Sequence, residues 1–451
     1  MQIHNYKYFF LTHFENIHFW DVNKYAQHTW DSIYDKVELL NCINEENKKH
    51  KLYKYPKEEF GILGINNKDG IFDAYLQKGK EINQAYKYME DGWLAYNPYR
   101  VNIGSIGIKR KEQRYQYISP AYVVFSCKEN LLSDYIYLTF KTNVFNQYIN
   151  KNTTGSVRQI LSFDTLKSLQ IPLPALSDQQ RLVNKYNTAI RQTEKQEQQA
   201  NKMEEDIENY LCEALGIEKQ KEEKWEMGKL YFVEFSAIVQ WRVEKSLMLK
   251  QKNILNSSKY NNVALIDYAD INPSTNIRYI KDNESISFVP MGCVSDIYGE
   301  IISMREGEKS NSKGYTRFQD NDLIWAKITP CMQNGKSAVA RNLKNGFGYG
   351  STEFHVLRVK NKNLSIDFLH LLLRTNKIRK DAVRYFTGST GQQRVPKSYL
   401  ESLSIPLPPL TIQNKIIIHI KSLQEHIKTL RHQAEKNRKK AIENFEKEIF
   451  K

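Results

Sequence analysis

The chain carries a long internal repeat, and this feature limits its possible folds more than any other. IPLPAL at 171–176 recurs as IPLPPL at 405–410, and TGS at 154–156 returns at 387–389. Near the two beginnings, Phe14 and Trp20 line up with Phe235 and Trp241. Solenoid repeats have periods of up to about 50 residues, so each of these much longer copies must fold as a domain-scale unit.

A long helix is predicted after each IPLP motif, because apolar residues follow at alternating spacings of four and three. The intervening positions are nearly all polar, so the apolar stripe needs a partner, and we expect the two helices to pair as an antiparallel coiled coil. The alternative is two amphipathic helices packed on different domains. Thr193 and Gln196 interrupt the first stripe and would fix its register. The main pairing positions are Leu182, Tyr186, Ala189, Met203, Ile207, Ile416, Ile420, Leu423, Ile427 and Leu430.

The segments before these helices have a β-rich texture interrupted by Gly, Asn and Asp turns. Strand runs are expected at 117–127, 286–294, 322–328 and 354–359, with one helix per unit at 134–149 and 367–383. The predicted class is α+β, with two tandem mixed α/β globular domains, two long helices and pseudo-twofold internal symmetry. A charged segment, 217–227, is interpreted as a hinge or a solvated helix end. The expected divisions are 1–170, 171–216, 217–404 and 405–451.

The composition favours a polyanionic partner. Lys and Arg outnumber Asp and Glu by 66 to 51, which gives a formal charge of +15; the alternative is a generally basic proteome. The five cysteines are scattered and no His pair has metal-ligand spacing, so no metal site is expected. No apolar run is long enough to span a membrane, and the N-terminus lacks a signal-peptide pattern. We therefore expect a soluble, cytoplasmic protein without a membrane partner.

The stretch Asn97-Pro98-Tyr99 is similar to the loop with which adenine methyltransferases grip a flipped base. Such an enzyme also needs a glycine-rich loop after a strand and an acidic residue about 20 residues further on. FGILGINNKDG at 60–70 is the candidate loop and lacks that acidic partner. No Ser-His-Asp set, P-loop or paired acidic site can be assembled either, so no catalytic residue is predicted. A self-sufficient adenine-N6 methyltransferase remains the alternative.

Two loops in each unit carry the residue types that contact DNA. The repeat places Tyr96–Ser105 opposite Lys327–Lys336, each with a Pro-containing turn followed by polar or basic groups and Gly. Arg and Lys can pair with guanine, and Asn or Gln with adenine; the alternative is an ordinary hairpin with solvated side chains. The candidates in the first unit are Tyr96, Asn97, Tyr99, Arg100, Asn102, Ser105, Thr154, Ser156 and Arg158. Those in the second unit are Lys327, Thr329, Gln333, Asn334, Lys336, Thr387, Ser389, Gln392, Gln393 and Arg394.

Together these motifs resemble the specificity (S) subunit of type I restriction-modification enzymes, over nearly the whole chain. The resemblance lies in the doubled IPLP-(A/P)-L, the Gln-containing helix starts SDQQRLV and TIQNKII, the loops NPYRVNIGSIG and LIWAKITPCMQNGK, and DYADINP at 267–273. The Glu-Gln usual in the family is Asp178-Gln179 in one copy and Ile412-Gln413 in the other.

The resemblance implies a non-catalytic DNA reader. Each globular domain would be a target recognition domain that binds one half of a bipartite, asymmetric site on double-stranded DNA. The paired helices would separate the two domains and dock two modification subunits, which carry S-adenosylmethionine and methylate adenines. Two restriction subunits that use ATP and Mg join in some systems. This chain itself would bind no cofactor. A third interpretation, based on the net positive charge, is a scaffold that binds nucleic acid without sequence specificity.

Overall fold

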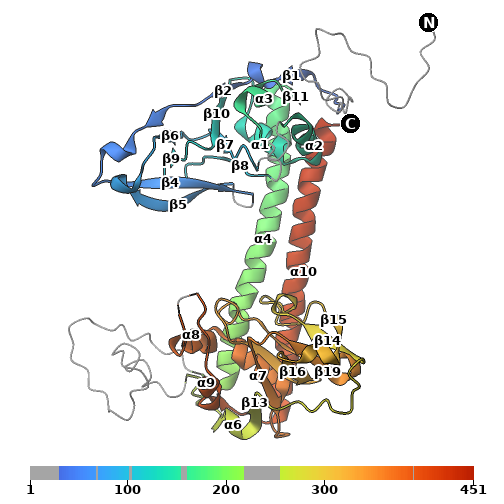
Figure 1. Ribbon diagram of the computed structural model, residues 1–451. Helices are drawn as coiled ribbons and strands as arrows, with labels where there is room; N and C mark the ends of the chain where they lie inside the picture. Colours follow the sequence, from blue (N-terminus) through green and yellow to red (C-terminus); the bar gives the residue numbers. More distant parts are fainter. Residues whose placement is uncertain (1–29, 68–69, 101–103, 154–159, 218–253, 390) are drawn as a thin grey trace. The chain divides into compact units, whose positions relative to one another are not determined.

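A computed structural model describes residues 30–67, 70–100, 104–153, 160–217, 254–389 and 391–451 (Figure 1). The chain forms two compact units: unit 1 is Met1–Glu197 with Arg431–Lys451, and unit 2 is Gln198–Leu430. Each unit therefore contains one globular part and a portion of both long helices. The proposed hinge beyond Ile217 and the residues Phe14, Trp20, Phe235 and Trp241 lie outside the described residues.

Each unit contains a four-stranded sheet with the same strand order. In unit 1 the order is β2-β10-β7-β8, and in unit 2 it is β13-β20-β17-β18, with every neighbour antiparallel. The unit 1 strands are β2 (Ile43–Glu45), β7 (Leu94–Tyr96), β8 (Ile106–Ile108) and β10 (Val123–Cys127). The unit 2 strands are β13 (Ala269–Ile271), β17 (Leu323–Ala326), β18 (Ser337–Val339) and β20 (Phe354–Val359).

A second sheet in each unit repeats a less common arrangement, in which one central pair of strands is parallel. In unit 1 the order is β3-β6-β9-β4-β5 with β4 parallel to β9, and in unit 2 it is β15-β14-β19-β16 with β14 parallel to β19. The unit 1 strands are β3 (Lys49–His50), β4 (Glu59–Asn66), β5 (Gly70–Lys78), β6 (Tyr86–Tyr88) and β9 (Tyr117–Ile118). The unit 2 strands are β14 (Ser285–Val289), β15 (Arg305–Glu308), β16 (Thr316–Gln319) and β19 (Phe347–Gly350).

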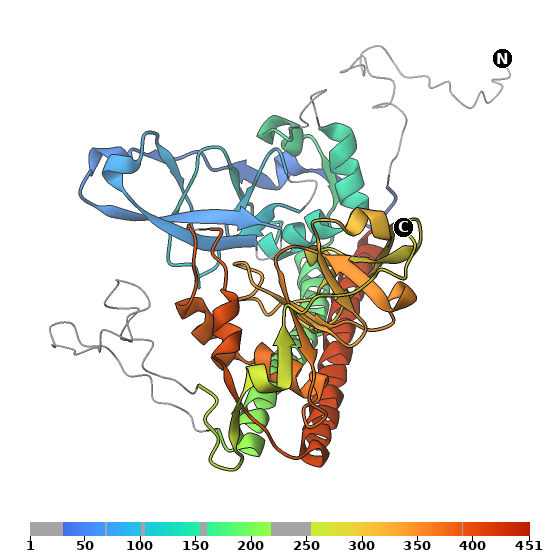
Figure 2. The same cartoon turned by 60° about the horizontal axis from the view of Figure 1, so that its bottom comes forward.

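The single helix expected in each unit is in fact two helices, and this prediction was wrong. Unit 1 has α1 (Ser133–Lys141) and α2 (Asn143–Asn152), while unit 2 has α7 (Ile366–Arg374) and α8 (Asn376–Arg384). The break falls at Thr142 and Thr375, whose extended backbone begins a new helix and whose hydroxyl accepts the N–H three residues on at 3.3 Å. Within their own units, α1 packs on β8 and α7 on β18. Figure 2 shows the same cartoon turned by 60°.

Short elements close each globular part in the same way. In unit 1, β1 (Lys36–Glu38) pairs antiparallel with β11 (Gln170–Pro172), and in unit 2, β12 (Asn262–Ala264) pairs with β21 (Ser404–Pro406). The helices α3 (Phe163–Lys167) and α9 (Lys397–Glu401) precede β11 and β21, and α6 (Leu265–Tyr268) follows β12. The IPLP motif is thus the end of a strand that returns to the start of its own unit.

Two long helices follow, α4 (Leu176–Leu215) and α10 (Leu410–Ile449), each of 40 residues. In unit 1, Arg181 and Lys185 of α4 contact Glu448 of α10, and Gln196 accepts a 3.2 Å hydrogen bond from Asn437. In unit 2, Met203 and Ile207 pack against an apolar cluster that contains Ile427 and Leu430. Among the other expected pairing positions, Leu182, Ile416 and Ile420 are buried, and Tyr186, Ala189 and Leu423 are half-buried.

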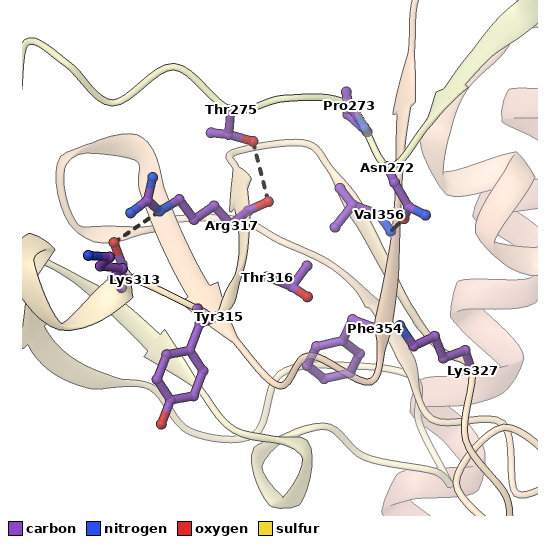
Figure 3. Close-up of a pocket in the computed structure, with 12 residues that line it drawn as sticks. Asn272, Pro273, Thr275, Lys313, Tyr315, Thr316, Arg317, Lys327, Phe354 and Val356 are labelled. Carbon is purple, nitrogen blue, oxygen red and sulfur yellow. Dashed lines mark hydrogen bonds between the residues drawn. The ribbon is translucent and has the colours of Figure 1, made fainter. Parts of the chain in front are cut away.

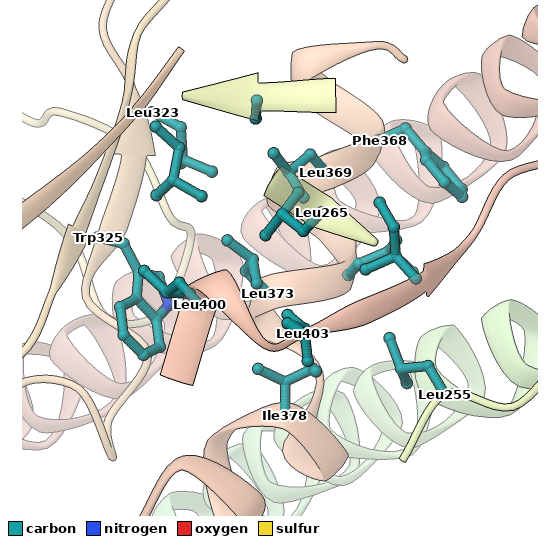
Figure 4. Packing of buried hydrophobic residues seen from close by; sticks show 14 of the residues in the cluster. Leu255, Leu265, Leu323, Trp325, Phe368, Leu369, Leu373, Ile378, Leu400 and Leu403 are labelled. Atoms are coloured by element: carbon teal, nitrogen blue, oxygen red, sulfur yellow. The ribbon is translucent and has the colours of Figure 1, made fainter. Parts of the chain in front are cut away.

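The cores join the helices to the sheets within each unit. In unit 2, Leu369 and Leu373 of α7 belong to one buried cluster with Leu323 and Trp325 of β17 (Figure 4). The same cluster takes in Ile416 and Ile420 of α10. In unit 1 the corresponding cluster includes Leu94, Tyr96 and Phe125 of the sheet, together with Leu182 and Phe445 from the long helices.

Candidate nucleic-acid interface

The loop between β7 and β8 and the loop between β17 and β18 are built on one plan. The backbone N–H of Asn97 donates to the Ser105 carbonyl at 3.0 Å, and the backbone N–H of Ala326 donates to the Lys336 carbonyl at the same distance. The residue before Ser105, Gly104, has a φ of 85°, and the residue before Lys336, Gly335, has a φ of 84°. A residue with a side chain is strained at such angles, so glycine is needed at this point in both units.

These backbone hydrogen bonds align the two loops differently from the comparison of their sequences. Since Asn97 corresponds to Ala326, the preceding Tyr96 corresponds to Trp325 and not to Lys327. Tyr96 and Trp325 are both buried in the cores of their units. The second loop is therefore two residues longer, and the extra residues lie between Lys327 and Gly335, whereas the sequence comparison gave both loops the same length.

A cation from the helix behind the sheet holds each loop in place. Lys141 at the end of α1 donates to the Gly104 carbonyl at 2.8 Å, and Arg374 at the end of α7 donates to the Gly335 carbonyl at 2.6 Å. Burial lowers the pKa of Lys141 to about 8 and that of Arg374 to about 10. Neither residue was a sequence candidate, because the contact joins segments far apart in the chain.

The loop of unit 1 presents two of its candidates to solvent. The Asn97 carboxamide accepts a 3.0 Å hydrogen bond from the Tyr99 amide, which shapes the turn. Tyr99 is 53% exposed, and Arg100 is also exposed. Tyr96 is 0% exposed with its hydroxyl on the Leu161 carbonyl, and Ser105 is also buried, so these two cannot offer side chains to DNA and the prediction for them was wrong. The candidates outside the described residues are Asn102, Thr154, Ser156 and Arg158.

In unit 2 the two candidate loops lie against each other. The Thr329 amide donates to the Gln393 carbonyl at 2.9 Å, and the Val395 amide donates to the Lys327 carbonyl at 2.9 Å. Arg394 and Thr387 exchange backbone hydrogen bonds across the second loop. Sequence positions more than 50 residues apart thus form one surface, whose exposed candidates are Gln333, Asn334, Thr387, Ser389 and Gln392.

Several basic and polar candidates in unit 2 are engaged within the protein. Arg394 binds the Glu353 carboxylate through its Nε and Nη2, and this ion pair lowers the pKa of Glu353. The Lys336 ammonium donates to the carbonyls of Met291 and Val294 at 3.3 and 3.1 Å, so its hydrogen bonds are made within the protein. The Thr329 hydroxyl bonds the Gln333 side chain. Base reading by Lys336 or Arg394 would require these contacts to break.

Lys327 belongs to a hollow of about 520 Å³ between the two sheets of unit 2 (Figure 3). The segment after β13 supplies Asn272 and Thr275, and the approach to β16 supplies Lys313 and Tyr315. Other lining residues are Pro273, Ser312, Gly314, Thr316, Arg317, Phe354 and Val356. Lys313 and Arg317 were not sequence candidates, since they belong to the approach and strand of β16 in one sheet, and only the folded chain places them in the same hollow as Lys327, which follows β17 of the other sheet.

The described residues lack a metal cluster, a disulfide and a membrane-spanning helix. These residues contain no group of three or more His, Cys, Asp and Glu that could hold a metal ion. The five cysteines are free thiols. No described helix has the length and apolar content needed to cross a bilayer.

The described residues define a class of protein with a duplicated α+β fold and a polar loop in each copy that is held by a cation from a helix. A family model described as the type I restriction modification DNA specificity domain matches residues 44–205 and 245–443. The chain belongs to this family, and the resemblance drawn from its motifs is confirmed.

Individual relatives support the family over shorter stretches. The chain is 39% identical over 160 residues to the EcoEI specificity subunit of Escherichia coli, and 39% identical over 156 residues to the EcoAI specificity subunit of the same organism. Both are described as subunits of type I restriction enzymes. Each match covers 34% of this chain and 26% of the relative, so the chain spans about a quarter of their length in these alignments.

Among solved structures, a chain described in connection with the assembly and conformational transition of a type I restriction-modification system is similar in fold. The TM-score is 0.54 at 14% identity, and the match covers 93% of this chain and 97% of the other. At this identity the likeness concerns the fold alone.

Proposed function

We propose that this chain is the DNA-reading subunit of a type I restriction-modification system, and that each globular part reads one half of a bipartite, asymmetric sequence. The observation that carries this proposal is the duplicated loop, built on Gly104 in one unit and Gly335 in the other and held each time by a cation from the helix behind it. The frame is the same, while the exposed side chains differ. Two similar frames with different side chains suit the reading of two different half-sites.

The two long helices are the proposed spacer. A 40-residue helix is about 60 Å long, and one turn of B-DNA is about 34 Å. Pairing as an antiparallel coiled coil is supported by contacts such as Asn437 with Gln196 in unit 1 and Ile427 with Met203 in unit 2. In this proposal 1–170 and 217–404 are the target recognition domains, and 171–216 and 405–451 are the spacer helices.

The chemistry is assigned to partners. Two modification subunits would dock on the spacer helices and supply S-adenosylmethionine, and restriction subunits would supply ATP- and Mg-dependent cleavage where the system has them. This chain would act as a non-catalytic cytoplasmic component that binds double-stranded DNA and no cofactor of its own.

The test is to express the chain with its modification partner and to map methylated adenines in cellular DNA. We expect methylation within one bipartite sequence, with two fixed half-sites and a fixed gap. Replacement of the exposed Arg100 by Ala should relax preference in one half-site only, with Lys362→Ala as an exposed control. Methyl transfer from labelled S-adenosylmethionine by the purified chain alone would support the methyltransferase alternative, and equal affinity for all duplexes would support the scaffold.

A further inference from the structure

We propose that the hollow of unit 2 holds the phosphodiester backbone of the DNA whose bases the adjacent loops read. Its cations are Lys313, Arg317 and Lys327. This inference rests on the proposed function, because it takes the ligand to be the same duplex. It gives Lys327 a different task from the base contact expected from sequence, and it assigns Lys313 and Arg317 to DNA binding.

The hollow is electropositive and its positive charge is not neutralised from within. Its lining includes no Asp or Glu, and among the described residues no carboxylate lies within ion-pair distance of Lys313 or Lys327. The charge of Glu353 interacts with Lys327, but the Glu353 carboxylate is already bound to Arg394. An anion entering the hollow therefore meets cations that have no anionic partner.

The shape of the hollow suits a length of backbone better than a single ion. Lys313 and Arg317 lie on one side and Lys327 on the other, with Thr316 between them (Figure 3). The ring of Tyr315 is 46% exposed at the rim and is braced edge-on by Tyr349 at 5.4 Å between centroids. Phosphate contacts from Lys, Arg and hydroxyl groups position a protein on a duplex, and a rigid aromatic ring adds contact with sugar or base.

The carboxamide of the hollow is not free to read a base. The Asn272 carboxamide accepts from the Val356 amide at 3.0 Å and lies 3.1 Å from the His355 ring nitrogen, so both of its ends are used. The Nε of Arg317 donates to the Ser312 hydroxyl at 3.0 Å, which holds the guanidinium in place. The hollow therefore offers cations and hydroxyl groups but no free carboxamide for pairing with adenine, which favours a phosphate site over a base-reading site.

The fold does not require the charges of Arg317 and Lys327, because unit 1 forms the corresponding pairing with uncharged residues at both places. In unit 2, Tyr349 of β19 pairs with Arg317 of β16 on one side and with Phe288 of β14 on the other. In unit 1, Tyr117 of β9 pairs in the same way with Tyr88 of β6 and with Ile62 of β4. Arg317 thus occupies the place of Tyr88. The Lys327 carbonyl accepts from Val395, as the Pro98 carbonyl accepts from Leu161, so Lys327 occupies the place of Pro98. Cations that the scaffold does not need are available for a ligand.

The experiment compares the full-length chain with the variants K313A, K327A and K313A/K327A. The control is K362A, which removes one charge, as each single variant does, from an exposed lysine outside the hollow. Affinity for a pool of randomised duplexes is measured by fluorescence anisotropy at several salt concentrations. The bound fraction of the same pool is then sequenced, so that salt dependence and base preference are obtained separately.

Each released phosphate contact should flatten the plot of log affinity against log salt by about 0.9. For the double variant, the affinity lost between 50 and 200 mM salt should therefore be about tenfold smaller than for the wild type. K362A should keep the wild-type slope, and the sequenced preference should stay unchanged in all variants. An unchanged slope in K313A/K327A, or a changed base preference, would overturn the proposal. Failure of the proposed function would appear differently, as a wild-type chain without any sequence preference.

Discussion

Gln413 lies where the long helix α10 begins, and its loss should destabilise unit 2 strongly. The side chain is 0% exposed. Its amide donates to the carbonyls of Asn363 and Pro408 at 2.7 and 2.8 Å, and its oxygen accepts from the Ser365 amide at 2.8 Å. Ser365 is the N-cap of α7, so one residue joins the starts of two helices. Gln179 makes the corresponding bonds in unit 1, to Asn130, Pro174 and Leu132.

The variant Gln413→Met keeps the length of the side chain but leaves three backbone groups without their partner. A buried group left unsatisfied costs about 1–3 kcal/mol, so at the lower limit the three groups cost about 3 kcal/mol. The assay is native-state hydrogen exchange, because a protein of two units need not unfold in one step. The opening free energy of the slowest amides of unit 2 should fall by this amount.

The matched control is Asn414→Met, one position further along the same helix turn, where the side chain is exposed. An exposed substitution away from such contacts changes stability by about 0.5 kcal/mol or less. Gln179→Met should cause a loss in unit 1 similar to that of Gln413→Met in unit 2. If Gln413→Met and Asn414→Met were equally stable, the assignment of Gln413 as a structural joint would be wrong.

Three further changes test other contacts. Replacing Asn437 and Gln196 together by Leu should raise stability by about 1 kcal/mol, because apolar seam positions replace one polar pair; a lower melting temperature would contradict helix pairing at this point. Arg394 lowers the pKa of Glu353, so the pair stabilises the fold above the carboxyl's unfolded pKa, and this contribution is lost as pH falls through the lower folded pKa. Glu353→Gln should therefore weaken the acid-induced fall in stability measured by urea titration, and an unaltered pH profile would refute the assignment. Gly335→Ala should cost about 1–2 kcal/mol in thermal denaturation, because its φ of 84° strains a side-chain-bearing residue; a neutral effect would show that the loop relaxes.

The repeat and the strand patterns allowed much of the fold to be predicted. The β-rich run at 354–359 coincides with β20, Phe354–Val359. The error at 134–149 has a local cause, since apolar periodicity continues through Thr142 although its hydroxyl caps a new helix. Periodicity reports which face is buried, and it does not report that a helix stops and restarts with the same face inward.

The candidate site was harder to predict because burial and partner choice depend on contacts distant in sequence. Tyr96 is the last residue of β7, a strand whose three residues are all buried, so it belongs to the core although the candidate loop starts directly after it. Arg394 looked available until its partner Glu353, 41 residues away, was located. Lys313 gave no signal in the sequence, since an isolated lysine is usually solvated, and only the hollow gives it a role.

The duplication separates scaffold residues from reading residues in a way that one unit alone would not. Gln179 and Gln413 do the same task in both units, as do Thr142 and Thr375, and such pairs are explained by folding. Where equivalent positions differ in chemistry while the backbone stays the same, folding does not account for the choice. Arg317 against Tyr88 is such a position. Exchanging these two residues between the units should therefore leave both folds intact and alter DNA binding, whereas exchanging either Gln for an apolar residue should do the reverse.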